Sequence, residues 1–375
     1  MTVPGAWAGP SGYPSVLVAE EGMREGLQIE DASISVEDRI RLLNALSATG
    51  LTRIVVGSFV SPKWTPQMAH VDEVVAGFTP APGVTYTALA LNDRGRERRA
   101  EFTPPLSGDA EVPATLVHLC DVFVRRNTNR SREDEIAGWP AIVAAAVTGH
   151  AQEAQIGVNS AWGSNWLGAF SHEERMELLE RQVALWDGAG IPVTRVFLGD
   201  PMGWHMPQAV EEDLRAIASR WPTITTVHLH LHNTRGMAPM AIYAALRTLG
   251  ERHTVILDSS IGGMAGCPYC GNGRAATLMP TEDLVHFLDG VGYNTGVDLD
   301  ALIEAVVLAE EILGHPLFGH VSKAGPRPEG DRLYAMDMPF IETLSEAQHF
   351  RLGPGVYAGA PSPWPHPITS PARNP

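Results

Sequence analysis

The chain has 375 residues, of which 44% are hydrophobic and 19% charged, a globular composition that excludes global disorder. Its 43 acidic and 27 basic residues give a formal net charge of −16, which argues against nucleic acid as a partner because such binding requires a basic face. There are three cysteines and no run of about 18 apolar residues, which argues against a disulfide scaffold and a membrane-spanning helix.

Hydrophobic patterning predicts alternating strands and helices from the N-terminus onward. The expected strands cover residues 16–20, 53–56, 85–89, 115–119, 155–159, 194–198, 226–230 and 255–258. The expected helices between and after them cover residues 36–48, 67–77, 133–148, 172–188, 208–219, 238–249 and 281–288. Ser35 is expected to cap the first helix. The first residues lack the basic region and apolar core of a secretory signal, so we expect a cytoplasmic protein.

Eight strands in alternation with helices predict an α/β fold of the (β/α)8 TIM-barrel type, whose active site lies on the loops after the C-terminal strand ends. An open doubly wound sheet is the alternative, but no glycine-rich phosphate motif follows the first strand. We expect an N-terminal extension over 1–14 and a barrel domain over 15–313 with an extra C-terminal helix at 299–313. A Pro/Gly-rich tail over 314–375 is expected to pack on the barrel or on a partner subunit.

The strongest local motif is HLHLHN, at residues 228–233. Alternate residues of a strand face the same side, so His228, His230 and His232 are expected to point into the barrel together. Imidazoles with this spacing can bind a divalent metal. A row of hydrogen-bonded core histidines is the alternative interpretation.

The first strand ends in AEEGMREGLQ, residues 19–28, which places several charged side chains on one loop. A guanidinium keeps a neighbouring carboxylate ionised, so Glu25 could bind a metal while Arg24 stabilises a developing oxyanion. A solvated ion pair is the alternative.

A glycine-rich segment, GGMAGCPYCGNGRA at 262–275, follows the eighth strand. Cys267 and Cys270 could form a redox pair, but the small thioredoxin-like context is missing. A structural zinc site would need further ligands, and Cys120 is the one other cysteine. A single thiol acting as a general acid requires one cysteine with access to the site. Cysteines without a chemical role remain the fourth interpretation.

Together these segments resemble the 3-hydroxy-3-methylglutaryl-CoA lyase branch of the DRE-TIM metallolyases. The similarity runs from about Val16 to Val306. It is carried by GSFVSPKWTPQM (57–68), FVRRNTNRS (123–131), LGDPMG (198–203), HLHNTRG (230–236), DSSIGGMAGCPY (258–269) and TEDLVHFLDGVGYNTGVDL (281–299).

The resemblance implies a TIM barrel that binds a divalent metal, Mg²⁺ or Mn²⁺. His230 and His232 fall on metal ligands, and Glu25 falls on the family's ligand Asp. The family's Asn ligand has no clear counterpart in this sequence; Asn272 and Thr277 are the nearest candidates, and we select Asn272.

The resemblance also implies catalytic roles. Arg24 falls on the residue that stabilises the enolate oxygen, Cys267 on the one that protonates the enolate, and Asp200 on an acid near the catalytic centre. The residues expected to bind the substrate are Gln28, Lys63, Asn127 and His205.

Several positions depart from the family pattern. Glu25 is one methylene longer than the family's Asp. The family's strand-two Glu, which pairs with the catalytic Arg, falls on Val55, so Glu20 or Glu21 is expected to replace its charge. Further departures are Asn233, Trp204 and His205.

The resemblance implies a metal-dependent carbon–carbon lyase that cleaves a 3-hydroxyacyl substrate, a CoA thioester or another hydroxy acid, to a ketone or keto acid and an enolate. A Claisen-type synthase is one alternative, since GNGRAAT (271–277) is similar to a motif of isopropylmalate and citramalate synthases. A catalytically impaired barrel that acts as a binding subunit is another. We expect a homodimer that binds neither nucleic acid nor membranes.

Overall fold

The computed structural model describes residues 3–108, 111–266, 270 and 277–333. The chain divides into two units, Met1–Ser322 and Lys323–Pro375. The first unit contains all the strands and takes in the N-terminal segment as well as residues 314–322. The second unit is described as far as residue 333 and contains a 3₁₀ turn at Gly330–Arg332. A short helix, α11 (Val321–Ala324), spans the boundary.

Eight parallel strands form the central sheet. They are β1 (Ser15–Glu20), β2 (Arg53–Ser58), β3 (Thr85–Leu89), β4 (Val117–His118), β5 (Ala154–Asn159), β8 (Val193–Asp200), β9 (Thr226–Leu231) and β10 (Thr254–Ser259). Their order is β3-β2-β1-β10-β9-β8-β5-β4, so the first strand of the chain pairs with the last. That pairing is continuous from Ser15–Thr254 to Glu20–Ser259. A chain that winds once around an axis produces this order, and the expected TIM-barrel fold is confirmed.

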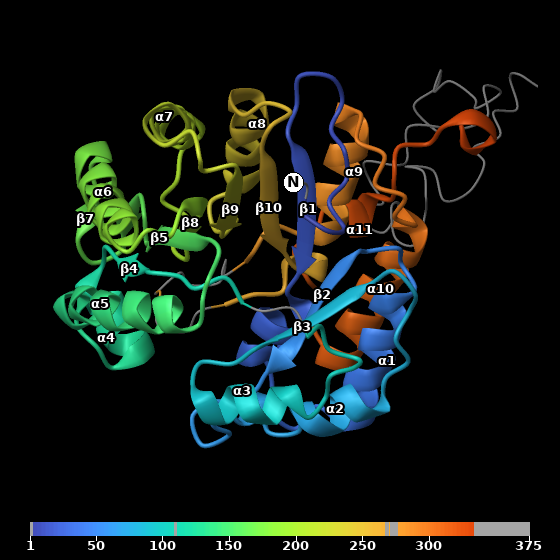
Figure 1. Ribbon diagram of the computed structural model, residues 1–375. Helices are drawn as coiled ribbons and strands as arrows, with labels where there is room; N and C mark the ends of the chain where they lie inside the picture. The colour runs from blue at the N-terminus through green and yellow to red at the C-terminus, as the bar shows by residue number, and fades with distance from the viewer. Residues whose placement is uncertain (1–2, 109–110, 267–269, 271–276, 334–375) are drawn as a thin grey trace, which may run out of the picture. The chain divides into compact units, whose positions relative to one another are not determined.

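The helices lie on the outer side of the curved sheet (Figure 1). They are α1 (Val36–Ser47), α2 (Val71–Gly77), α3 (Asp93–Ala100), α4 (Asp121–Thr128), α5 (Arg132–Thr148), α6 (His172–Gly188), α7 (Pro207–Arg220), α8 (Ala238–Thr248), α9 (Thr281–Val291) and α10 (Leu299–Leu313). Serines define three of their starts, because Ser35 accepts a hydrogen bond from Asp38 N while Ser131 and Ser171 form full capping boxes.

Helices α3 and α4 and the β6–β7 hairpin were not expected from the sequence. Helix α3 buries only Gly95 of its eight residues, so it has no apolar periodicity to detect. Helix α4 begins three residues after the end of β4 and is capped by Cys120 rather than by a preferred residue. The hairpin of β6 (Gly163–Ser164) and β7 (Gly168–Ala169) has two residues per strand, too few for a period-two pattern.

Alternate residues of the strands divide between two apolar regions. Val16 and Val18 belong to the large cluster between sheet and helices, whereas Leu17 packs inside the barrel with Ile256. The N-terminal segment contributes to this interior, since Val3 joins the same small cluster. The segment is also paired with β1 through Trp7, whose N–H donates to Val16 O at 2.7 Å.

Residues 314–322 pack on the barrel beside the loop that follows β10. The Phe318 N–H donates to Gly262 O at 2.9 Å. The carboxylate of Asp283, at the start of α9, accepts hydrogen bonds from the His320 ring at 2.9 Å and the Val321 N–H at 2.7 Å. This part of the expected C-terminal extension therefore belongs to the first unit.

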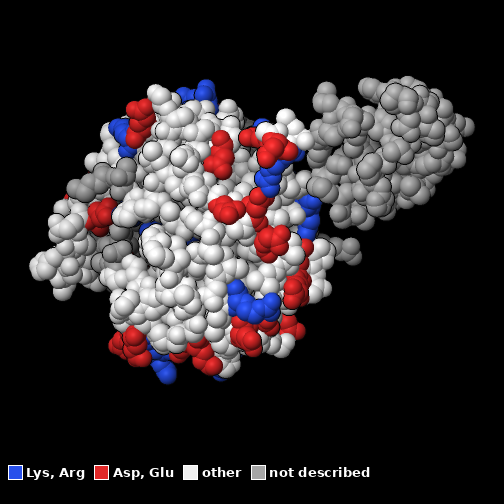
Figure 2. Space-filling view, turned by 90° about the vertical axis from the view of Figure 1, so that its right-hand side faces the viewer, with Lys and Arg blue, Asp and Glu red and all other residues white. Residues whose placement is uncertain are grey.

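Acidic side chains are more prominent than basic ones on the face drawn in Figure 2, in keeping with the net charge of −16. Within the part of the chain that the structure describes, the helices are all too short or too polar to cross a bilayer.

Candidate metal and catalytic centre

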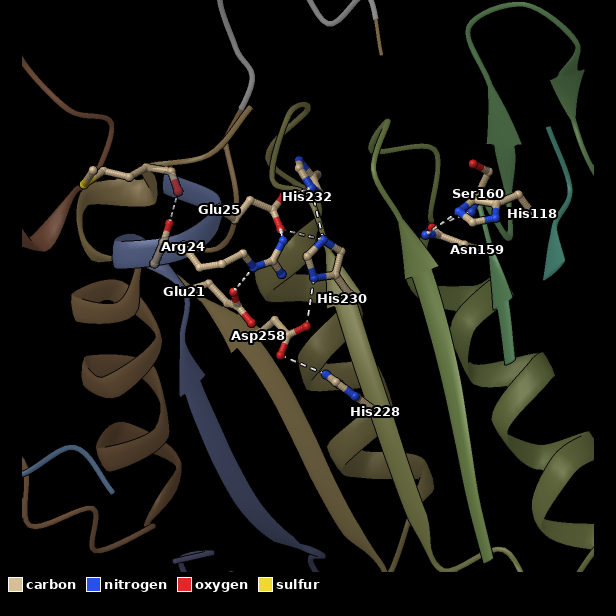
Figure 3. Close-up of polar contacts among 12 residues, drawn as sticks. Glu21, Arg24, Glu25, His118, Asn159, Ser160, His228, His230, His232 and Asp258 are labelled. Carbon is tan, nitrogen blue, oxygen red and sulfur yellow. Dashed lines mark hydrogen bonds and ion pairs between the residues drawn. The ribbon is translucent and has the colours of Figure 1, made fainter. Parts of the chain in front are cut away.

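The C-terminal ends of β1, β10 and β9, which are neighbours in the sheet, meet at one place (Figure 3). Directly after β1, a π-helical turn at Gly22–Gly26 carries Arg24 and Glu25. A Cβ on Gly22, at the start of the turn, would lie 2.5 Å from a carboxylate oxygen of Glu20, so a side chain there would displace that carboxylate. Turns of this kind are frequent at functional sites. Here the turn presents the side chains of Arg24 and Glu25 toward the histidines of β9.

Three buried side chains converge at this place: Glu25, His230 and His232. The Nε2 atom of His232 lies 2.9 Å from Glu25 Oε1, and the Nε2 atom of His230 lies 3.5 Å from Glu25 Oε2. The two Nε2 atoms are 3.2 Å apart. Ligand atoms about 2.1 Å from one ion and at right angles to each other are about 3.0 Å apart, so these distances suit a divalent cation.

Asp258, on β10, sets the orientation of His230. The Nδ1–H of His230 donates to Asp258 Oδ2 at 2.8 Å. A neutral His230 held in this way aims the lone pair of its Nε2 atom at the Glu25 carboxylate, which is a repulsive arrangement unless a cation or a proton lies between them. Hydrogen bonding of a metal-binding histidine to a carboxylate is a recurrent feature of metal sites.

Arg24 lies beside this group and pairs with two carboxylates. Its Nε atom is 2.6 Å from Glu21 Oε2, and its Nη1 atom is 3.1 Å from Glu25 Oε2. The guanidinium is mostly buried, so charge-assisted hydrogen bonds hold it in a fixed position. Burial raises the pKa of Glu21, and the nearby charge of Arg24 opposes that shift.

The charges of the cluster also suit a divalent cation. Three carboxylates, Glu21, Glu25 and Asp258, lie against the guanidinium of Arg24, which leaves two negative charges when the acids are ionised and the histidines are neutral, the form in which imidazoles bind a metal. Burial alone would raise the pKa of Glu25, but the charges of His230 and Arg24 lower it well below its usual range. Burial alone would lower the pKa of His230 by disfavouring its protonated form, but Glu25 and Asp258 raise that pKa to about 10. The site therefore attracts positive charge.

Glu20 and Glu21 are adjacent in sequence but point to different surroundings. Glu21 pairs with Arg24, whereas Glu20 accepts hydrogen bonds from the N–H groups of Gly22 at 2.7 Å and Ile261 at 3.1 Å. The hydroxyl of Thr281 also donates to Glu20. Burial raises the pKa of Glu20 to about 8. Of the two acids expected to serve Arg24, Glu21 is therefore the one that does so.

Asp200 binds the loop that follows β8. Its carboxylate accepts hydrogen bonds from the ring Nδ1 of His205 at 2.8 Å and from the backbone N–H groups of His205 at 2.6 Å and Met202 at 3.1 Å. Burial opposes ionisation, but these bonds lower the pKa of Asp200. Among the described residues, the buried Nε2 atom of His205 has no hydrogen-bond partner. The two residues form a pair that is separate from the three-donor group.

The other expected site residues are more dispersed. Gln28 is half-buried on the 3₁₀ turn at Leu27–Ile29, and Asn127 is exposed on α4. Lys63 lies over the ring of the exposed Trp64, with its Nζ atom 5.4 Å from the ring centroid. Cys267 and Asn272 lie outside the described residues. Their expected roles stay predictions.

Sequence reasoning missed the part played by Asp258 and a second polar group at the same end of the barrel. The ring of His118 donates to Glu135 at 2.8 Å, and its Nε2 atom accepts from Asn159 at 3.3 Å. Ser160 follows with a φ of 52°, a left-handed conformation uncommon for serine. Only their position in the sequence could have indicated these residues, because they lie at the C-terminal ends of β4 and β5, as the histidines lie at the C-terminal end of β9.

The chain is similar to proteins of known function over most of its length. The model of the family described as HMGL-like matches residues 16–308. The 3-hydroxy-3-isohexenylglutaryl-CoA/hydroxymethylglutaryl-CoA lyase of Pseudomonas aeruginosa is 36% identical over 82% of this chain and 96% of its own length. The mitochondrial hydroxymethylglutaryl-CoA lyase of Mus musculus is 32% identical over 77% of this chain and 83% of its own.

Solved structures agree with this similarity. An HMG-CoA lyase from Acinetobacter baumannii, in complex with coenzyme A and 3-methylmalate, superposes with a TM-score of 0.67 and 30% identity. The match covers 87% of this chain and 97% of that one. A hydroxymethylglutaryl-CoA lyase from Pseudomonas aeruginosa gives a TM-score of 0.65 at 32% identity over 84% of this chain and 97% of its own.

Proposed function

This chain belongs to the HMGL-like family and is a carbon–carbon lyase, and we propose that it cleaves a 3-hydroxyacyl-CoA thioester to an acyl-CoA and a ketone or keto acid. The observation that carries the proposal is the convergence of Glu25, His230 and His232 beside the guanidinium of Arg24. The relatives support the substrate class, since two are lyases of hydroxymethylglutaryl-CoA and one structure holds coenzyme A with 3-methylmalate.

Glu25, His230 and His232 would hold the divalent metal, Mg²⁺ or Mn²⁺, and Asn272 is the proposed fourth ligand. The fit rests on the donor spacing, on the Nε2 lone pair of His230 that faces Glu25, and on the two uncompensated negative charges. When bound, such an ion supplies Lewis acidity to the hydroxyl and carbonyl oxygens of the substrate.

The chain's own residues account for the rest of the reaction. A base removes the proton of the 3-hydroxyl, the Cα–Cβ bond breaks, and its electron pair moves to the thioester as an enolate. Arg24, fixed by Glu21, stabilises the enolate oxygen, and the Cys267 thiol donates the proton that completes the acyl-CoA. Asp200 is a weak candidate for the base because its hydrogen bonds lower its pKa.

Neither alternative function gains support. A Claisen-type synthase would release free CoA, whereas the relatives named above are lyases. A catalytically impaired barrel would be expected to lose its metal-binding side chains. In this chain Glu25, His230 and His232 lie together beside Arg24. The predicted substrate contacts stay Gln28, Lys63, Asn127 and His205. The cytoplasmic location and the homodimer also stay predictions, and light scattering tests the oligomeric state.

The test is a screen of purified protein with Mg²⁺ or Mn²⁺ against 3-hydroxyacyl-CoA thioesters, with products identified by mass spectrometry. We expect an acyl-CoA and a ketone or keto acid, and loss of turnover with a chelator. Release of free CoA from acetyl-CoA and a 2-oxo acid would support the synthase instead. Turnover that survives complete removal of metal would contradict the proposal.

A further inference from the structure

Asp258 lies between two imidazoles of the same strand (Figure 3). Its Oδ2 atom accepts from the Nδ1–H of His230 and its Oδ1 atom from the Nε2–H of His228, each at 2.8 Å. The proposed metal site uses His230 but not His228. The third histidine of the motif is thus joined to the metal ligand through one carboxylate.

This arrangement restricts the carboxylate. A rotation of Asp258 about its side chain would break both charge-assisted hydrogen bonds, and neither is easily replaced at a buried position. Phe197, on β8, contacts both rings: its centroid lies 5.1 Å from that of His228 and 6.3 Å from that of His230. The two imidazoles therefore share one anion and one aromatic neighbour.

The geometry also excludes His228 as a direct ligand. Its Nε2 atom is occupied by Asp258, and the three-donor group of the described residues consists of Glu25, His230 and His232. Its partly exposed side chain faces the barrel interior beneath that group. A role in metal binding must therefore pass through Asp258.

We infer that His228 is a positioning residue for the metal site: by holding the Asp258 carboxylate in place, it fixes the imidazole of His230 with its Nε2 atom toward Glu25. The inference rests on the proposed metal-dependent function. Outer partners of metal-binding histidines typically contribute about 10–100-fold to metal affinity, so removal of His228 is expected to weaken binding by roughly 10-fold.

The test measures Mn²⁺ affinity by titration calorimetry in the full chain, without substrate. His228→Leu fills the space but removes the donor, whereas His228→Gln places an amide N–H near the original Nε2 position. We expect the leucine variant to lose roughly 10-fold in affinity and the glutamine variant to stay within about threefold of the wild type. His253→Leu is the control, because His253 is buried just before β10, at the opposite end of the strand from Asp258.

A double-mutant cycle tests the route. Adding His228→Leu to Asp258→Asn should cost no further affinity if the effect passes through Asp258. Equal Mn²⁺ affinity of the wild type and His228→Leu overturns the inference and leaves the metal site standing; no Mn²⁺ binding by the wild type overturns the proposed function. Should His228→Leu fail to fold by circular dichroism, His228→Asn, whose shorter amide cannot reach Asp258, replaces it with the same expected loss.

Discussion

The carboxylate of Glu21 binds the guanidinium of Arg24 at 2.6 Å, so the charge partner of the proposed catalytic arginine comes from three residues before it in the chain. The resemblance implies an acid on strand two for that task, at the position that Val55 occupies in this chain. In this chain the partner comes from the residue directly after β1 and not from β2. Arg24 stays fixed in the site although the strand-two acid is absent.

We predict that Glu21→Gln lowers kcat by about 10–100-fold, because a hydrogen bond between charged groups contributes about 1.5–3 kcal/mol. Steady-state kinetics with the 3-hydroxyacyl-CoA substrate measure the effect. Glu37→Gln, on the exposed first turn of α1, is the control. Adding Val55→Glu to Glu21→Gln should recover part of the loss. An unchanged kcat in Glu21→Gln would show that Arg24 does not need this partner.

Two variants of Glu25, the proposed carboxylate ligand, distinguish the contribution of its side-chain length from that of its charge. Glu25→Asp keeps the negative charge but moves it one methylene away from His230 and His232, whereas Glu25→Ala removes it. We expect Mn²⁺ affinity to fall by roughly 10-fold in the first variant and more than roughly 100-fold in the second, as loss of a direct ligand exceeds that of an outer partner. Calorimetric titration measures both. Wild-type affinity in Glu25→Ala would exclude Glu25 as a ligand.

Cys267 is predicted to donate the proton to the enolate, so Cys267→Ser should lose most of the activity while Mn²⁺ affinity stays unchanged. A serine hydroxyl is a far weaker acid than a thiol and transfers its proton poorly near neutral pH. Cys270→Ser, three residues further along, is the matched control. If the two variants lose activity equally, the loss reports a disturbance of the loop rather than a specific acid.

The buried Glu20 predicts a dependence of stability on pH. Burial raises its pKa to about 8, so the folded state holds a proton that the unfolded state loses near its ordinary value of 4.5. The free energy of unfolding should therefore fall as pH rises from 5 to 8, by at most about 1.4 kcal/mol per pH unit for this group. Glu20→Gln keeps the hydrogen-bonding shape and should flatten that slope. Urea unfolding at several pH values measures it, and identical slopes would contradict the assignment.

Asp213 is fully buried on α7 and binds Arg175 at 2.7 Å, His172 at 2.6 Å and the indole N–H of Trp162 at 2.8 Å. Asp213→Asn leaves Arg175 as a buried charge without its partner, so we expect a loss of about 3–5 kcal/mol in the free energy of unfolding. Glu211→Gln breaks the exposed ion pair with Arg215 on the same helix and should cost less than about 1 kcal/mol. Urea denaturation compares them; equal losses would contradict this assignment.

The sequence by itself determined the alternation of strands and helices and the common direction of the histidines. Both are local properties, because a buried strand or an amphipathic helix repeats its pattern within a few residues. The charged loop after β1 could be assigned to the same barrel end as His230 and His232 for the same reason: parallel strands end together. Helix α3 was not predicted because its sequence is almost uniformly polar and has no apolar periodicity.

Only the tertiary structure decided which charges meet. Glu20 and Glu21 look equivalent in sequence, yet Glu20 is the last residue of β1 and enters a buried network with Thr281, whereas Glu21 begins the following turn and reaches Arg24. Asp258 joins His228 and His230 across a strand pairing that spans about 30 residues of chain, a contact that no local spacing records. Periodicity along the chain predicts which face of a strand or helix a residue lies on. The residue that it contacts depends on the distances between separate strands in the folded protein.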